Sequence, residues 1–399
     1  MVKGKNYSIK NVTILTGAGL TASQDFFGLT TLGLTEKFIN YRHKDISENK
    51  KLVKYLYKAF CLKNNLEPKA HSKNLNQINF ETILQIIEEL HAYAEDIEKT
   101  ELGAKFINSI KSTIYKLRPE IVEHVIKDRS YRAHKFYFFL EKLYNHLIDL
   151  TIKQLVKYND DKANKGMNEF HTFLKIAFPE KDFAKRIYTL NYDNWLSKFG
   201  NYYDGFDGDT FNSLKVIQDR EINCHYNLHG CILWDWLSHK KLIKPRITKH
   251  SQSGTEPTIA REALLPSPII SGYNKLTRIH SALYLEIFHS LLTDCVSSNR
   301  LLIIGYSFSD PHINDILRLT NPDCPVEIVV RYSADCLANP NDDIFRVFYV
   351  IAGIFNTNFT APKIKPDTEQ LIESDDLRIS VFINGIGETF YQDYLRIKS

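Results

Sequence analysis

The sequence predicts an α/β protein with a mostly parallel sheet, interrupted by a large all-helical insertion. Short β-branched and apolar runs, typical of buried strands, occur at residues 11–15, 186–190, 224–228, 301–304 and 326–330. Helical patterns lie between or after several of these runs, and strands that alternate with helices indicate βαβ units. From about residue 45 to residue 178, apolar residues recur at three- and four-residue spacing, which indicates helices alone.

The composition is that of a globular protein. The chain has 399 residues, of which 43% are hydrophobic and 25% charged, so it can bury a core and is neither disordered nor fibrous. The net charge of +4 is too small to indicate a nucleic-acid partner by itself. Six cysteines without a Cys-x-x-Cys pair indicate reduced thiols rather than a disulfide framework.

The sequence indicates no membrane attachment. The apolar run at residues 347–355 is about half as long as the ~20 residues that a helix needs to cross a bilayer. Residues 1–10 are polar and basic and lead into a strand without a small-residue cleavage site, unlike a secretory signal. We therefore expect a cytoplasmic protein.

The first candidate site is a glycine turn directly after the first predicted strand. Gly17, Gly19 and Ala22 fit the Gly-x-Gly-x-x-Gly/Ala pattern of Rossmann-like dinucleotide-binding proteins. Glycines allow backbone N–H groups to approach a pyrophosphate beside the positive end of the next helix. The pattern alone leaves dinucleotide binding and simple strand–helix packing equally open. Glu36 stands near the offset of a ribose-binding acid, but its surroundings look helical, which argues against a dehydrogenase.

Two further predicted strands end in polar side chains. Asn191 and Asp193 follow the strand at residues 186–190, and His229 follows the strand at residues 224–228. The carboxyl ends of parallel strands face the ligand crevice of an open sheet, so these side chains can reach a shared site. The imidazole of a histidine titrates near neutral pH and is suited to accept a proton. The alternative for Asn191 and Asp193 is an Asx turn that caps the next helix.

A metal site is the alternative interpretation for His229. Cys224, His225 and Cys231 stand close to it in the sequence. Along a strand, His225 and His229 share one face, whereas the two cysteines fall on opposite faces. Because no paired ligands occur elsewhere in the chain, zinc is disfavoured and we expect no metal.

The last candidate site follows the strand at residues 301–304. Gly305, Ser307 and Ser309 come directly after it, and Asp310 and Pro311 indicate the N-cap and first residue of a helix. The run resembles a Gly-x-Ser-x-Gly nucleophile elbow with serine at the final glycine position. Small polar residues at a helix start suit phosphate or ribose hydroxyls better than they suit an attacking serine.

Taken together, the four strand ends resemble the sirtuin family, whose members cleave NAD at the nicotinamide–ribose bond. The matching features are the glycine turn, Asn-x-Asp, His-Gly and Gly-x-Ser, in that order. They cover the α/β core, roughly residues 10–38 and 184–332, and not the helical block between them. The resemblance implies a Rossmann-like, sirtuin-like fold that takes NAD as its substrate.

The resemblance also implies a role for each matching residue. Asn191 would hold the ribose and an ordered water, Asp193 would orient the nicotinamide carboxamide, and His229 would be the catalytic histidine. The residues that would bind NAD at its phosphates or its adenosine side are Gly17, Ala18, Gly19, Thr21, Gly305 and Ser307. We add Asp310, the predicted N-cap beside them, to this NAD-binding set.

Departures from the family pattern narrow the expected activity. Deacylating sirtuins carry two Cys-x-x-Cys pairs between the histidine and the Gly-x-Ser strand, and residues 230–300 contain none, so no zinc module is expected. Protein deacylation therefore loses its usual support. Residues 25–28 read Asp-Phe-Phe-Gly where the family has Asp-Phe-Arg-Gly, so the group that balances the pyrophosphate charge is not identified.

The predicted strands and helices divide the chain into four parts. Residues 1–44 are the first part of the NAD-binding core, residues 45–183 the helical insertion, residues 184–335 the second part of the core, and residues 336–399 a C-terminal α/β extension. The aromatic stretches of the helical block exceed what one helix face can bury, so we expect a homo-oligomer. Residues 240–271 are either a lid over the site or a plain connection.

A sirtuin-like core with a helical insertion and no zinc module looks like the bacterial antiphage branch of the family. Its members hydrolyse NAD to ADP-ribose and nicotinamide when infection is sensed, and the resemblance implies a HerA-type ATPase partner or self-assembly as the trigger. The alternatives are a protein deacylase or ADP-ribosyltransferase, a non-catalytic NAD or ADP-ribose sensor, and a nucleic-acid-binding subunit. The last would use the basic stretches at residues 42–73 and 240–249, although we expect no direct nucleic-acid binding.

Overall fold

The computed structural model describes most of the α/β core and small parts of the helical block. The described residues are 10–22, 31–39, 79–85, 87, 144, 146–155, 164–193, 201–208, 210–231, 234–237, 241–243, 283–331, 342–359, 371–383, 385–386, 390–392 and 394–395. Three sequence-based predictions fall outside them. These concern the basic stretch at residues 42–73 and all but the first residues of the 240–271 segment. The third concerns residues 136–139, which belong to the aromatic stretches of the helical block.

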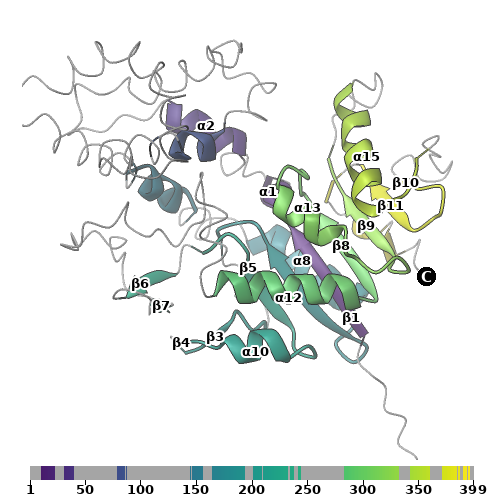
Figure 1. Ribbon diagram of the computed structural model, residues 1–399, viewed down its shortest axis with the longest axis horizontal. Helices are drawn as coiled ribbons and strands as arrows, with labels where there is room; N and C mark the ends of the chain where they lie inside the picture. Colours follow the sequence, from purple (N-terminus) through teal and green to yellow (C-terminus); the bar gives the residue numbers. More distant parts are fainter. Residues whose placement is uncertain are drawn as a thin grey trace, which may run out of the picture.

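A seven-stranded, mostly parallel sheet forms the centre of the molecule (Figure 1). In spatial order its strands are β10 (Leu371–Glu373), β11 (Ile379–Phe382), β9 (Val326–Val329), β8 (Arg300–Ile304), β1 (Lys10–Thr16), β2 (Phe183–Thr189) and β5 (Cys224–Asn227). Within this sheet, as described, only β10 runs antiparallel to its neighbour. The predicted α/β fold with a mostly parallel sheet is confirmed.

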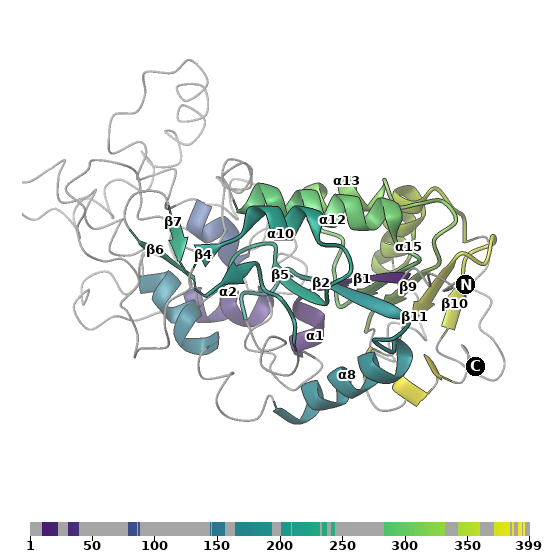
Figure 2. The same cartoon turned by 90° about the horizontal axis from the view of Figure 1, so that it is seen from below.

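Helices cover both faces of the sheet, which explains why its strands are apolar on both sides. One face packs against α10 (Ser213–Gln218), α12 (Tyr284–Ser297), α13 (Pro311–Leu317) and α15 (Asp342–Phe355). The opposite face packs against α1 (Ala18–Ala22) and α8 (Asn164–Ala177), and Figure 2 shows the two layers. Along β1, Ile14 joins the core under α8 and Leu15 joins the core under α12.

The sheet draws on parts of the chain that the sequence places outside the core. β11 pairs in parallel with β9, so the C-terminal extension continues the same sheet. α8 belongs to the predicted helical block, yet its buried Phe170, Phe173 and Leu174 pack on the sheet with Ile14 and Ile187. Other described residues of that block, 80–85 and 146–155, are helical, as is α2 (Thr31–Ile39), which contains Glu36.

A second, four-stranded sheet was not predicted. It has the order β3 (Phe206–Asp207), β4 (Thr210–Phe211), β7 (Lys241–Ile243) and β6 (Asp235–Leu237). Strands of two or three residues offer too few alternating positions to be recognised from periodicity. The segment at residues 240–271, expected as a lid or plain connection, thus begins with a strand that pairs with β6 and β4.

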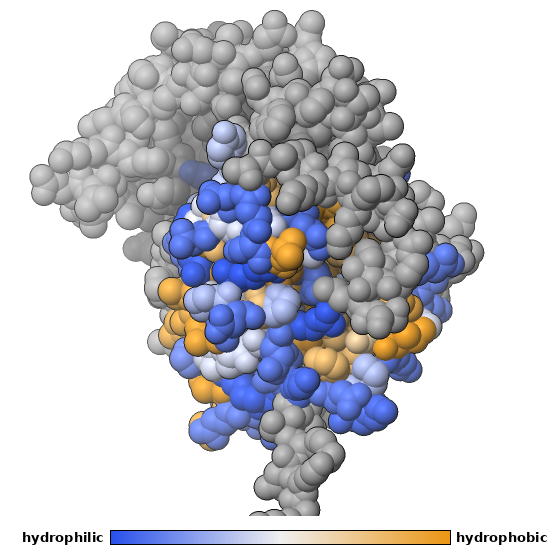
Figure 3. All heavy atoms as spheres, turned by 90° about the vertical axis from the view of Figure 1, so that its right-hand side faces the viewer, coloured by the Kyte–Doolittle hydropathy of each residue, from blue (hydrophilic) through white to orange (hydrophobic). Residues whose placement is uncertain are grey.

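Exposed hydrophobic side chains are spread over many elements. The large ones are Ile176, Leu214, Leu285, Val296, Leu319, Tyr349 and Leu377. On the face shown in Figure 3, hydrophobic groups stand between hydrophilic ones. These observations do not test the expected homo-oligomer. Within the same part of the chain, no helix combines the length and the apolar character that crossing a membrane requires.

A buried ionic network holds β2 against α12. Arg186 Nε lies 2.8 Å from Asp294 Oδ2, and both side chains are inaccessible to solvent. Arg220 Nη1 lies 3.1 Å from the other carboxylate oxygen of Asp294. Ser290 Oγ accepts hydrogen bonds from both arginines. Since a buried charge without its partner costs about 3–5 kcal/mol, the network fixes the position of β2 relative to the helix layer.

The strand order predicts a ligand crevice at the carboxyl ends of β1 and β8. From β1 the sheet continues through β2 and β5 on one side, whereas β8, β9 and β11 lie on the other. The helix after β1 packs on one face of the sheet and the helix after β8 packs on the opposite face. Adjacent strands whose connections leave in opposite directions open a crevice at their carboxyl ends, where α/β proteins bind ligands.

Three glycines bring the loops after β1 and β8 into backbone contact. Gly305 has φ +61°, and a Cβ there would collide with the backbone of Gly19 and Leu20. A Cβ on Gly17 or Gly19 would lie 2.6 Å from Gly305 O or Cα, respectively. The Gly19 N–H donates to Gly305 O at 2.9 Å, and the Gly17 N–H donates to Ile304 O at 2.9 Å. Side chains at these positions would separate the two loops.

We therefore predict that Gly305→Ala destabilises the protein more than Gly208→Ala does. Gly208 is a matched control, because its φ of +64° is similar but a Cβ there would have no neighbour within 4 Å. The left-handed backbone alone costs about 1–2 kcal/mol, whereas the collision at Gly305 adds about 1–3 kcal/mol. Urea unfolding of the purified variants measures both free energies. Equal losses would show that the two loops are not in close contact.

Candidate functional site

The loop after β2 joins the glycine turn through Asn191. Its Nδ2 donates to Gly17 O at 3.2 Å and to Thr21 Oγ1 at 3.0 Å. Its backbone N–H donates to Thr189 Oγ1 at 3.0 Å. Because both amide hydrogens point toward the glycine turn, the carbonyl oxygen of the same amide is turned the other way. The predicted alternative, an Asx turn capping the next helix, concerns residues 194–199, which lie outside the described residues.

The loop after β5 joins the loop after β2 through Asn227, a residue that sequence reasoning missed. Asn227 is the buried last residue of β5, and its Nδ2 donates to Asn191 O at 3.0 Å and to Asp193 O at 2.7 Å. Asp193 is also buried. The sequence signal that could have identified Asn227 is a side-chain amide at the end of a strand, two residues before His229. By holding two carbonyl groups, Asn227 fixes the backbone that carries both predicted catalytic residues of this loop.

The loop after β5 also reaches the loop after β8. His229 Nε2 lies 3.2 Å from Asp310 Oδ2, and the two side chains are only 6% and 9% exposed. In the sheet, β1 and β2 lie between β5 and β8, so the two strands are about 14 Å apart at ~4.8 Å per spacing. The two loops must therefore arch over the carboxyl ends of β1 and β2 to meet.

Asp310 is the N-cap of α13, as predicted from the sequence. Its Oδ1 accepts a hydrogen bond from the His312 N–H at 3.1 Å, and Pro311 is the first helical residue. Asn314 supports the same turn, because its Nδ2 donates to the carbonyl oxygen of Phe308 at 2.9 Å. Phe308 itself has a positive φ of 56°. The carboxylate of Asp310 is thus held by the helix while its other oxygen faces His229.

The remaining predicted NAD-binding residues differ in exposure. Gly19 and Ser307 are exposed, Ala18 and Gly305 are partly exposed, and Thr21 is buried under Asn191. Ser307 Oγ lies 2.7 Å from Ser309 Oγ. The glycine turn packs against the β8 segment, because the N–H groups of Gly17 and Gly19 donate hydrogen bonds to it. This is the structural role that the sequence left open for the turn.

The four strand ends therefore form a closed set of contacts. The loop after β1 contacts the loop after β8 and the loop after β2. The loop after β2 also contacts the loop after β5, and the loop after β5 contacts the loop after β8. The structure thus brings together all four motifs that the sequence singled out. Their side chains supply an amide, a carboxylate and an imidazole at one end of the sheet.

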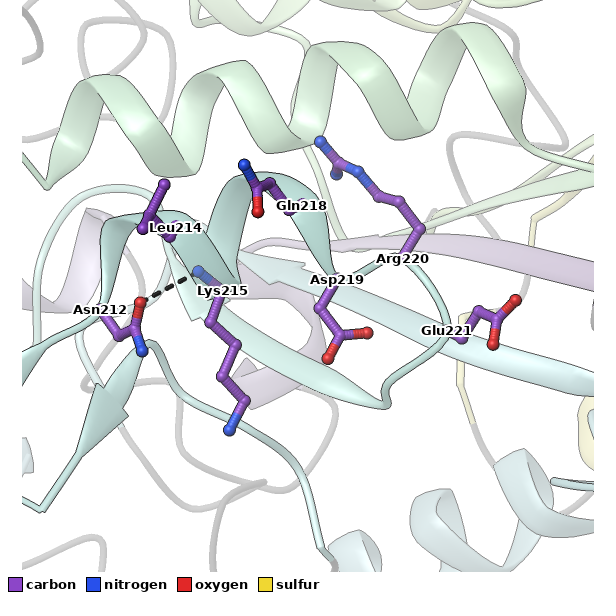
Figure 4. Close-up of a pocket in the computed structure, with 7 residues that line it drawn as sticks. All are labelled: Asn212, Leu214, Lys215, Gln218, Asp219, Arg220 and Glu221. Carbon is purple, nitrogen blue, oxygen red and sulfur yellow. Dashed lines mark hydrogen bonds between the residues drawn. The ribbon is translucent and has the colours of Figure 1, made fainter.

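A surface depression among the described residues lies elsewhere on the molecule. It has a volume of about 660 Å³ and runs along α10 and the turn after it, and Figure 4 shows Asn212, Lys215, Arg220 and Glu221 among its lining residues. The contact drawn there is local, from the Lys215 N–H to Asn212 Oδ1. Because the turn leads into the amino end of β5, the depression lies at the other end of the sheet from the four loops. It therefore has no part in their chemistry.

The cysteines near His229 do not form a metal site with it. Burial raises the pKa of Cys224 to about 12, so its thiol stays protonated at neutral pH and is a poor metal ligand. Cys224 and Cys231 both pack in the core under α12. Within the described ranges, no group of three or more His, Cys, Asp or Glu side chains is arranged to hold a metal ion.

The comparison with known proteins finds a similarity in the second part of the core. No curated protein matches the chain. Residues 185–321 match the SIR2-like domain, and this segment includes Asn191, Asp193, His229 and the turn from Gly305 to Asp310. The match covers about a third of the chain and leaves out β1 with its glycine turn. It supports a sirtuin-like family for this protein and, with it, an NAD-related activity.

Proposed function

We propose that this protein hydrolyses NAD to ADP-ribose and nicotinamide. The observation that carries the proposal is the closed set of contacts among the four loops, in which Asn191 is tied to the glycine turn and His229 to Asp310. The SIR2-like match supports the choice of NAD, since it includes three of these loops. The sequence resemblance supports hydrolysis over deacylation, because residues 230–300 contain no Cys-x-x-Cys pair.

The proposed reaction needs only NAD and water. The bond between ribose C1′ and the nicotinamide nitrogen breaks, and its electron pair goes to that nitrogen, which loses its positive charge. A water oxygen forms the new bond to C1′, and the proton of that water goes to His229, directly or through a ribose hydroxyl. Since cationic nicotinamide is already a competent leaving group, no general acid is required.

The residues of the four loops divide this work. Asn191 would hold the ribose and the attacking water through its carbonyl oxygen, which is turned away from the glycine turn. Asp193 would orient the nicotinamide carboxamide, and the burial of Asp193 and His229 would keep other water away from the developing cation. The proposed NAD-binding residues are Gly17, Ala18, Gly19, Thr21, Gly305 and Ser307. The sequence also predicts an NAD contact for Asp310, but the approach of its carboxylate to His229 favours a different role for this residue.

The cellular role that fits this activity is antiphage defence by NAD depletion in the cytoplasm. The proposal rests on the resemblance to the bacterial antiphage branch of the sirtuins. It includes a homo-oligomer and a HerA-type ATPase as the partner that holds the trigger. The assays below are therefore run on the purified chain both alone and with a candidate ATPase.

We predict that Asn191→Ala and His229→Ala reduce nicotinamide release at least about 100-fold, because they remove the group that positions water and the group that accepts its proton. Chromatography with mass detection measures nicotinamide and ADP-ribose. Asp315→Ala is the control, because Asp315 is an exposed residue of α13 that pairs with Arg318. Thermal unfolding shows that each variant is folded.

A folded Asn191→Ala protein that releases nicotinamide at the wild-type rate would contradict the assignment of Asn191. Wild-type protein that releases no nicotinamide, either alone or with the ATPase, would contradict the proposed hydrolysis itself.

We also predict that nicotinamide release does not depend on an acceptor. A deacylase or ADP-ribosyltransferase shares the NAD pocket but releases nicotinamide only with an acyl-lysine peptide or a target protein. Adding an acetyl-lysine peptide should change the rate by less than about twofold, since water is the proposed acceptor. A rate that rises with peptide concentration, with the peptide modified, would favour the alternatives.

A further inference from the structure

The contact between His229 and Asp310 joins the loops after β5 and β8, two strands that are not neighbours in the sheet. It becomes an ion pair when His229 is protonated, whereas the other recorded links among the four loops are backbone contacts and amide hydrogen bonds. The imidazole comes from the loop after β5, and the carboxylate comes from the start of α13 after β8. The position of the proposed proton acceptor is therefore set from the far side of the crevice.

The carboxylate of Asp310 is held in one orientation. Oδ1 accepts the hydrogen bond from the His312 N–H, so Oδ2 is the oxygen directed at His229 Nε2. Tyr306 supports the backbone of the same residue, because its hydroxyl oxygen lies 2.9 Å from Asp310 O. A carboxylate fixed in this way accepts a hydrogen bond but cannot donate one while ionised.

We propose that Asp310 is a positioning residue for His229, whose imidazole it holds by the approach of Oδ2 to Nε2 at 3.2 Å. This inference rests on the proposed NAD hydrolysis and refines it. It differs from the direct NAD contact expected for Asp310 from the sequence. The negative carboxylate would stabilise the imidazolium that forms when His229 takes the proton from water.

The other titratable groups near this pair have other recorded partners or stay neutral. Burial, followed by the nearby Asp310, raises the pKa of the Tyr306 hydroxyl, which stays neutral. Burial, followed by Glu81, likewise raises the pKa of Tyr192, whose hydroxyl donates to Glu81 Oε1 at 3.3 Å. Asp193 belongs to the loop that Asn227 holds. Asp310 is therefore the carboxylate recorded against the imidazole in the described part of the chain.

Asp310→Asn is the informative substitution. Asparagine caps a helix as well as aspartate does, so α13 keeps its N-cap. Because the oxygen of the new side-chain amide would then accept from the His312 N–H, its NH₂ group would face His229 Nε2. An NH₂ group carries no negative charge, so the imidazolium that forms at His229 would lose its stabilising carboxylate.

The expected result is a fall in kcat of at least about 100-fold with the KM for NAD unchanged within about twofold. Asp315→Asn is the matched control, because it removes one carboxylate from the same helix at an exposed position. It should leave both constants as in the wild type. Asp310→Ser provides a second test, since serine also caps a helix but carries no carboxylate, and it should lower kcat in the same way.

Nitrogen NMR of ¹⁵N-histidine-labelled protein provides a readout that does not depend on activity. The His229 signals, assigned with His229→Gln and followed through a pH titration, should show an imidazole that gains its proton at lower pH in Asp310→Asn than in the wild type. Asp315→Asn should leave the titration of His229 as in the wild type.

Each outcome decides the inference. An unchanged kcat and an unchanged titration of His229 in Asp310→Asn would overturn it. A rise in KM alone would overturn it in favour of direct NAD contact by Asp310. Wild-type protein without NAD cleavage, but with the shifted titration of His229 in Asp310→Asn, would contradict the proposed hydrolysis and support the positioning contact.

Discussion

The backbone contact between Gly305 and the Gly17–Gly19 turn is the constraint on which the rest of the site depends. Without side chains at these three positions, the loops after β1 and β8 share hydrogen bonds at the point where the strand order changes direction. Asn191 then bonds to the same turn, and Asn227 holds the loop that carries Asn191. A wider separation of the first two loops would move each of the later contacts, including the approach of His229 to Asp310.

The site is thus assembled by topology rather than by one segment of chain. Its residues come from the ends of four strands, and the pair that completes it belongs to strands separated by two others. The buried network around Arg186 and Asp294 keeps β2 in place against α12, so the strand that delivers Asn191 is fixed along its length. A rigid scaffold of this kind suits a reaction that depends on orienting one water and one leaving group.

Much of this arrangement could be predicted from the sequence, because β-branched runs and the residues that end them are local signals. The four strand ends, the helical setting of Glu36 and the N-cap role of Asp310 are examples. Asn227 was missed because a lone asparagine at a strand end has many uses. The pairs Arg186–Asp294 and His229–Asp310 were missed because contacts between residues far apart in the chain leave no local pattern. The small sheet was missed because its strands are too short to show a period.

The most direct test of the central claim is a crystal structure of the Asn191→Ala protein with NAD, since this variant should bind the nucleotide without consuming it. The account predicts NAD across the crevice between the loops after β1 and β8, with ribose C1′ within about 4 Å of the water or imidazole at His229. NAD bound along α10, or at the loops with its nicotinamide ribose far from His229, would contradict it.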